Sequence, residues 1–147
     1  MPRQANMRHS ERGGTLIEFT VTAGIFFTML IAITAAGHLF WTHNALVEAT
    51  RRGARYAATH AVNDPNVKNV VVYGTPNPAP SAAPFVDNLE ADNVMVEPSA
   101  DFGVGQGSVS VSITGFEYNF VIPGIDQQIP MPAYNTTLTG ESAGLMP

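Results

Sequence analysis

Few side chains in this 147-residue chain have the types and spacing that catalysis or metal binding requires. His38 and His43 are five positions apart, about 140° around a helix, so they would not face one zinc ion as an i, i+4 pair does. Residues 140–144, GESAG, match the G-x-S-x-G pattern of hydrolases, but no acid or histidine follows to complete a triad. The sequence therefore predicts no enzyme, no metal site and no other cofactor.

The acidic residues of the second half also lack a recognised binding pattern. Asp87, Glu90 and Asp92 lie close together and Asp101 follows, but their spacing does not match a calcium-binding hand, so a calcium role is only an alternative interpretation. The glycines at positions 103, 105 and 107 do not form a dinucleotide fingerprint. The absence of cysteine excludes disulfides, thiol catalysis and thiolate metal ligands.

One carboxylate stands where the surrounding sequence makes it costly. Glu18 directly precedes residues 19–41, a run without Asp, Glu, Lys or Arg that would extend about 35 Å as a helix. Such a run can span a bilayer, where a carboxylate is costly unless it is protonated or paired. We therefore expect Glu18 to have a specific partner. The alternative is that it reaches water at the headgroups and has no specific role.

Charge is divided unequally along the chain. Residues 1–12 hold three arginines and one acid. The chain after Tyr56 holds nine acids, and Lys68 is its one Lys or Arg residue. Positive residues beside a span favour the cytoplasmic side, so the N-terminus is expected there and the acidic part outside the cytoplasm. An acidic exported domain is not expected to bind nucleic acid.

Two segments resemble a known family. Residues 13–18, GGTLIE, resemble the class III signal of type IV pilin-like proteins, in which a membrane peptidase cuts after a glycine and leaves a glutamate at the fifth mature position. Counting back from Glu18 places the cut between Gly13 and Gly14, with a cut after Gly14 as the second choice. The Glu18-Phe19 pair is similar to the tight-adherence (Tad) branch, although Gly14 stands where classical pilins begin with Phe. Residues 49–58, ATRRGARYAA, are similar to a segment of TadE-like pseudopilins.

This resemblance covers roughly residues 12–61 and implies a function in bacterial pilus systems. It implies a pseudopilin or minor pilin that acts in assembly or initiation of a tight-adherence pilus. The implied partners are a prepilin peptidase, other pilin or pseudopilin subunits, the inner-membrane assembly platform and the lipid bilayer. The protein would cross the inner membrane once, and it would either remain there or enter the filament. Glu18 would then meet the new terminal ammonium of Gly14 on a neighbouring subunit.

The helical pattern continues beyond the apolar run. Small residues recur every four positions, which places them in a ridge along one side of a helix that another helix or sheet can approach closely. These residues are Ala45, Ala49, Gly53, Ala57 and Ala61. The predicted organisation is a leader over residues 1–13, a long helix over 14–61 with its membrane span at about 19–41, and an exported β-rich domain over 62–147.

The distal part predicts a small antiparallel sheet. Residues 67–73, VKNVVVY, are rich in β-branched side chains and predict a first strand. Residues 74–84 contain four prolines and predict an extended loop. Further strands are predicted at 93–97, 108–114, 116–122 and 134–139, the last at a sheet edge. The predicted fold class is α+β, with the long helix packed on the sheet as in pilins.

Two other interpretations remain open. The first is an uncleaved single-pass protein of another envelope complex, which would retain residues 1–13. The second is a secreted binding module, because Thr34-Ala35-Ala36 has the small-x-small pattern of an ordinary signal-peptidase site. The apolar run is too long for an ordinary signal and continues to Trp41, which favours the membrane anchor.

Overall fold

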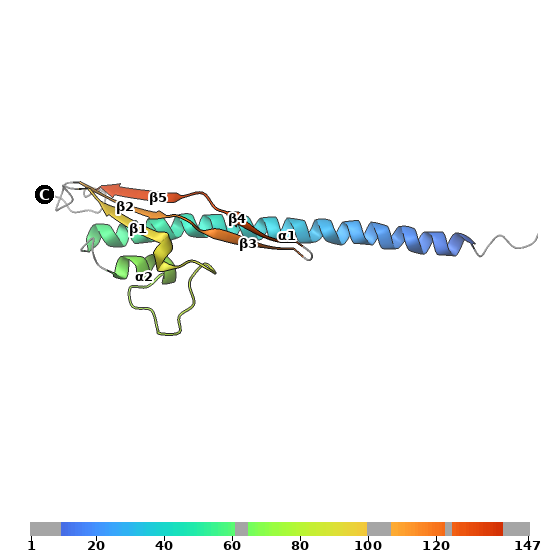
Figure 1. The fold of residues 1–147 in the computed structure, drawn as a ribbon, viewed down its shortest axis with the longest axis horizontal. Helices are drawn as coiled ribbons and strands as arrows, with labels where there is room; N and C mark the ends of the chain where they lie inside the picture. The colour runs from blue at the N-terminus through green and yellow to red at the C-terminus, as the bar shows by residue number, and fades with distance from the viewer. Residues whose placement is uncertain (1–9, 61–64, 100–106, 123–124, 140–147) are drawn as a thin grey trace, which may run out of the picture. The chain divides into compact units, whose positions relative to one another are not determined.

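The computed structural model describes residues 10–60, 65–99, 107–122 and 125–139. One long helix is followed by a short helix and small antiparallel sheets, so the fold is α+β, as the sequence predicts (Figure 1). The chain divides into two compact units, Met1–Gly37 and His38–Pro147. In chain order the elements are α1 (Ser10–Thr59), α2 (Asn66–Tyr73), the 3₁₀ helix η1 (Ala91–Asn93), β1 (Val94–Pro98), β2 (Ser108–Ile113), β3 (Glu117–Ile122), β4 (Ile125–Pro130) and β5 (Tyr134–Thr139).

The helix α1 is continuous because its sequence contains no proline and is rich in Leu, Ile, Phe, Ala and Met. Its polar residues do not interrupt it. The hydroxyls of Thr20, Thr28 and Thr34 donate to the carbonyl oxygens four residues earlier, at 2.8, 2.8 and 3.0 Å. Such back-bonding lets a hydroxyl lie in an apolar helix without an unsatisfied donor.

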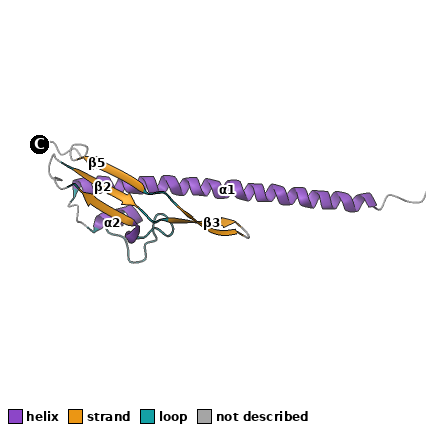
Figure 2. Cartoon of the chain, turned by 45° about the horizontal axis from the view of Figure 1, so that its top comes forward, coloured by secondary structure: helices purple, strands orange, loops and turns teal. Residues whose placement is uncertain are grey.

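The strand β2 is the centre of a three-stranded antiparallel sheet of order β1-β2-β5. Val111 of β2 pairs with Val96 of β1 and with Thr136 of β5, and β2 and β5 lie side by side in Figure 2. Along β2, fully buried valine and isoleucine alternate with half-buried serine, which is the two-residue period that predicts a half-buried strand. The predictions of β1 and β2, and of β5 at the sheet edge, are confirmed.

Residues 67–73 form the helix α2, so the prediction of a strand there is wrong. A strand would turn Val67 and Val71 to one face and Val70 to the other, whereas a helix places all three on one buried face. Gly74 ends the helix in the left-handed region at φ 75°, and its amide donates to the carbonyl of Val70 at 3.0 Å. Burial of one helical face therefore outweighs the weak β-propensity of valine.

The segment after α2 has neither helix nor strand over residues 74–84, as predicted. Its two ends are fixed by hydrogen bonds to α2. The Asn69 side-chain amide donates to the carbonyl of Pro76 at 3.1 Å, and the Phe85 amide donates to the carbonyl of Val72 at 2.7 Å. These bonds hold Phe85 beside the core although it lies in an irregular segment.

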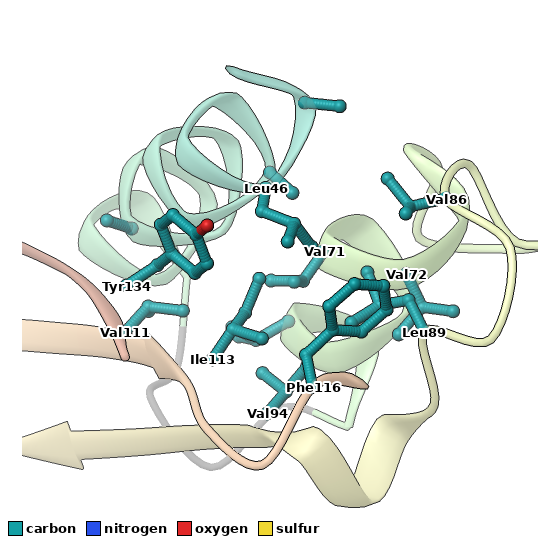
Figure 3. Packing of buried hydrophobic residues seen from close by; sticks show 14 of the residues in the cluster. Leu46, Val71, Val72, Val86, Leu89, Val94, Val111, Ile113, Phe116 and Tyr134 are labelled. Carbon is teal, nitrogen blue, oxygen red and sulfur yellow. The ribbon is translucent and has the colours of Figure 1, made fainter. Parts of the chain in front are cut away.

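The hydrophobic core of the His38–Pro147 unit is made by α1, α2 and the inner face of the three-stranded sheet (Figure 3). Leu46 of α1, Val71 of α2 and Ile113 of β2 are fully buried there. Phe116 and Tyr134 close its border with 3 and 5 % of their surface exposed. The second part of α1 is thus a component of this unit's core.

The strands β3 and β4 form a separate antiparallel ribbon in which Tyr118 pairs with Ile129. The sequence predicts β3 but not β4, because the segment IDQQIP lacks an alternating apolar pattern. Pairing with β3 supplies the backbone hydrogen bonds of β4. Since a two-stranded ribbon is marginally stable alone, its packing through the buried Tyr118 matters for its position.

Candidate functional site

The residues expected at the processing and assembly site lie in the first part of α1. Gly13, Gly14, Glu18 and Phe19 are helical and exposed. A Cβ on either glycine would meet no atom within 4 Å, so neither glycine is required by local packing. Positions four apart share a helix face, so Glu18 lies on the same side of α1 as the residue that would become the new N-terminus, Gly14.

Large apolar side chains cover the surface of α1 on both sides of Glu18 in sequence. They have no cover within their own unit, and each would lose roughly 1.5–3 kcal/mol of transfer free energy if it were left in water. Within the described part of the chain, one helical segment, Gly13–Thr59, is long and apolar enough to cross a membrane. This helix suggests membrane anchoring. The exposed side chains include Leu16, Ile17, Phe19, Val21, Ile25, Phe26, Phe27, Met29, Leu30 and Ile33.

The small residues on the second part of α1 lie in the core. Ala45, Ala49 and Ala57 are buried, and Gly53 lies between them. A Cβ on Gly53 would overlap Cγ2 of Val71 and approach Cγ1 of Val111 to 3.3 Å. Both α2 and β2 therefore approach α1 at the same position. The fifth residue of the predicted ridge, Ala61, lies outside the described residues.

Polar side-chain contacts join α1 to the strands. The Oη of Tyr118 lies 2.6 Å from Nδ1 of His38, and the Oη of Tyr134 lies 2.8 Å from Nδ1 of His43. The hydroxyls of Thr50 and Thr136 are 2.9 Å apart, so the nearly fully buried Thr50 is satisfied. Burial raises the pKa of both tyrosines, because it disfavours the phenolate.

The sequence does not predict these contacts. Each of the two histidines contacts a different tyrosine on a different strand. The partners are 80 and 91 residues apart in sequence, so no local pattern connects them. The one available signal is that each tyrosine stands at an inward position of its strand.

Arg52 lies at a contact between α1 and the segment after α2. Its Cζ is 4.5 Å from the ring centroid of Phe85, within the range of a cation–π interaction. Its Nε and Nη2 atoms are buried without a hydrogen-bond partner. The neighbouring Arg51 and Arg55 are exposed. The guanidinium of Arg52 is therefore held mainly by an aromatic face.

The potential catalytic and metal-binding residues are not brought together. Within the ranges that the structure describes, no group of three His, Cys, Asp or Glu side chains could hold a metal ion. Asp87, Glu90 and Asp92 are exposed, and Glu90 forms a capping box with Asn93 at η1, which is a structural use of that acid. Asp101 and the segment 140–144 lie outside the described residues.

A long N-terminal helix with an apolar, uncovered first part and a second part built into a small α+β unit defines a class of helix-anchored proteins. Residues 13–55 match the family described as TadE-like protein, which is a pilus-associated structural family, and the chain is TadE-like over that segment. The match suggests that the protein takes part in a Tad pilus system and interacts with other components of the pilus. The match includes Glu18 and Gly53 and ends before α2. Comparison with curated proteins and with solved structures gives no match.

Proposed function

We propose that the protein is a pseudopilin or minor pilin that acts in the assembly or initiation of a tight-adherence pilus. The observation that carries this proposal is the TadE-like match over residues 13–55, which coincides with the uncovered apolar part of α1 and its continuation into the core. A helix of this kind needs lipid or neighbouring apolar helices around it. A pilin-like subunit is surrounded by lipid in the membrane and by neighbouring apolar helices after assembly.

We propose that a prepilin peptidase removes residues 1–13. The exposed Gly13 and Gly14 support this site, since neither carries a side chain that would obstruct a peptidase. The positive N-terminal residues would hold this end in the cytoplasm. The His38–Pro147 unit would then lie on the opposite side of the inner membrane. The assembly platform and other pilin subunits would then be within reach of α1.

Glu18 is the proposed register residue. After cleavage, the ammonium of Gly14 and the carboxylate of Glu18 have opposite charges in surroundings of low dielectric constant, where their attraction is strong. A subunit that pairs its Glu18 with a neighbour's ammonium satisfies both charges. A subunit out of register leaves a charge unpaired, which disfavours incorrect assembly.

One observation favours a second candidate, a secreted module. Cleavage after Ala36 would leave Gly37 followed by the compact unit that begins at His38. However, Phe40 and Trp41 are 68 and 52 % exposed, and a released module would present both to water. Their exposure is better explained if this end of the unit remains at a membrane.

The test is the N-terminal sequence and intact mass of the membrane-extracted protein, with and without the host's prepilin peptidase. A start at Gly14 that depends on this peptidase is the expected result. A start at Met1 in both strains would contradict the processing step and indicate an uncleaved anchor. A start at Gly37 would instead support the secreted module.

A further inference from the structure

Five aromatic rings form a continuous chain at one level of α1. The ring centroids of Phe85 and Trp41 are 6.2 Å apart, and those of Trp41 and His38 are 5.7 Å apart. His38 lies 5.7 Å from Tyr118, and Tyr118 lies 6.3 Å from Phe120. We call these five residues the aromatic belt. Its members come from α1, β3 and the segment after α2, so tertiary folding assembles it.

The aromatic belt coincides with the end of the apolar run. Trp41 is the last residue of that run, and His38 lies less than one turn before it. Trp41 and Phe85 keep 52 and 45 % of their surface exposed although they contact each other, so the pair presents an apolar surface. Arg52 lies over the ring of Phe85, and two exposed acids, Glu117 and Asp87, lie within two residues of the belt in sequence.

We propose that the aromatic belt seats the His38–Pro147 unit on the headgroup region of the bilayer that α1 crosses. This inference rests on the membrane anchoring in the proposed function. Trp, Tyr and His have an apolar body and a polar edge, and Trp and Tyr are enriched at the headgroup level of membranes. A helix that spans through residues 19–41 places Trp41 at that level, and the contacts with Trp41 and His38 then place Phe85 and Tyr118 there too.

The outer face of the three-stranded sheet, by contrast with the belt, is polar. The outer face of the sheet carries serine, threonine and asparagine, with Ser110 donating to Oδ1 of Asn135 at 2.6 Å. Met95, 52 % exposed on β1, is a large apolar side chain of that face. A polar sheet face would gain nothing in lipid, whereas the belt includes Trp41, the last residue of the apolar run.

The single tryptophan of the chain makes the inference directly measurable. The full chain is reconstituted in vesicles whose lipids are brominated either near the headgroups or deep in the acyl chains, and tryptophan quenching is recorded. In a Trp41→Phe background, Phe85→Trp tests the belt, Met95→Trp is the matched exposed control, and Phe120→Trp is a second probe if Phe85→Trp does not fold. We expect shallow-bromine quenching of Phe85→Trp to exceed that of Met95→Trp by about twofold or more.

The possible outcomes separate this inference from the proposed function. Equal quenching of Phe85→Trp and Met95→Trp, with Trp41 of the unaltered chain quenched, would overturn the belt while anchoring stands. No quenching of Trp41 would contradict membrane anchoring itself. Emission of Phe85→Trp that changes with the protein-to-lipid ratio but not with brominated lipid would assign the rings to a second copy of the chain and also overturn the inference.

Discussion

Gly53 of α1 lies so close to Val71 of α2 that any Cβ at position 53 would overlap Cγ2 of Val71. Glycine within a helix costs roughly 0.5–1 kcal/mol relative to alanine, because it loses more backbone entropy on folding. Here that cost is offset by the approach of two elements, since Val111 of β2 lies on the same side. Gly53 therefore fixes how closely α2 and the sheet pack on α1.

Gly53→Ala is expected to lower the free energy of unfolding by about 1–3 kcal/mol, because valine cannot move its stiff, fully buried side chain away. The measurement is thermal or denaturant unfolding of the full chain in detergent. Gly37→Ala is the matched control, because a Cβ there meets nothing within 4 Å. The double variant Gly53→Ala/Val71→Ala should be less destabilised than the sum of its single changes. An additive result would show that the two positions do not compete for space.

Tyr134 is expected to make the unit less stable in alkali. Burial raises the folded pKa of Tyr134 above its unfolded value near 10, so the unfolded chain loses this proton first as pH rises. Its contribution is fully present below pH 10 and decreases as pH rises through the folded pKa. Unfolding measured from pH 8 to 11.5 should therefore show a smaller loss of stability in Tyr134→Phe.

The same variant separates two effects of the tyrosine hydroxyl. Loss of the contact with His43 should lower the free energy of unfolding by about 1 kcal/mol at all these pH values. Loss of the ionisable hydroxyl should change only how steeply the free energy of unfolding falls with pH. Tyr118, whose pKa burial also raises, is present in both proteins, so its effect cancels in the comparison. Parallel pH profiles for the two proteins would contradict the assignment to Tyr134.

Arg52 and Phe85 should be energetically coupled. Phe85→Leu removes an aromatic face under the guanidinium, so its destabilisation should be larger with Arg52 present than in Arg52→Met, by about 0.5–2 kcal/mol. The measurement is a double-mutant cycle on the free energy of unfolding. Arg51→Met is the matched control because Arg51 is exposed, and its coupling to Phe85→Leu should be near zero. Coupling of equal size at both arginines would assign the effect to net charge.

Glu18→Gln should block pilus assembly but leave processing and membrane insertion unchanged. The amide keeps the shape of the side chain but cannot form a charge pair with an ammonium group. Pilus yield and the N-terminal sequence of the membrane fraction measure the two steps separately. Glu48→Gln is the control, since Glu48 is an exposed acid on the second part of α1. Normal assembly in Glu18→Gln would eliminate the proposed pairing.

The sequence alone determined the features that depend on local composition. The uncharged run and the absence of proline predict α1, and the alternation of valine and serine predicts β2 with its buried face. The four-residue spacing of small side chains also predicts which side of α1 packs closely. Each is a repeating property of neighbouring residues, so it can be read without knowing what they contact.

Only the tertiary structure decided α2, β4 and the partners of the two histidines. Residues 67–73 have the composition of a strand, but burial of Val67, Val70 and Val71 on one face stabilises a helix. The segment of β4 lacks a pattern of its own and is a strand because β3 supplies its hydrogen bonds. The histidines contact tyrosines far away in the chain. In each case the deciding free energy comes from contacts between distant segments, which local composition does not encode.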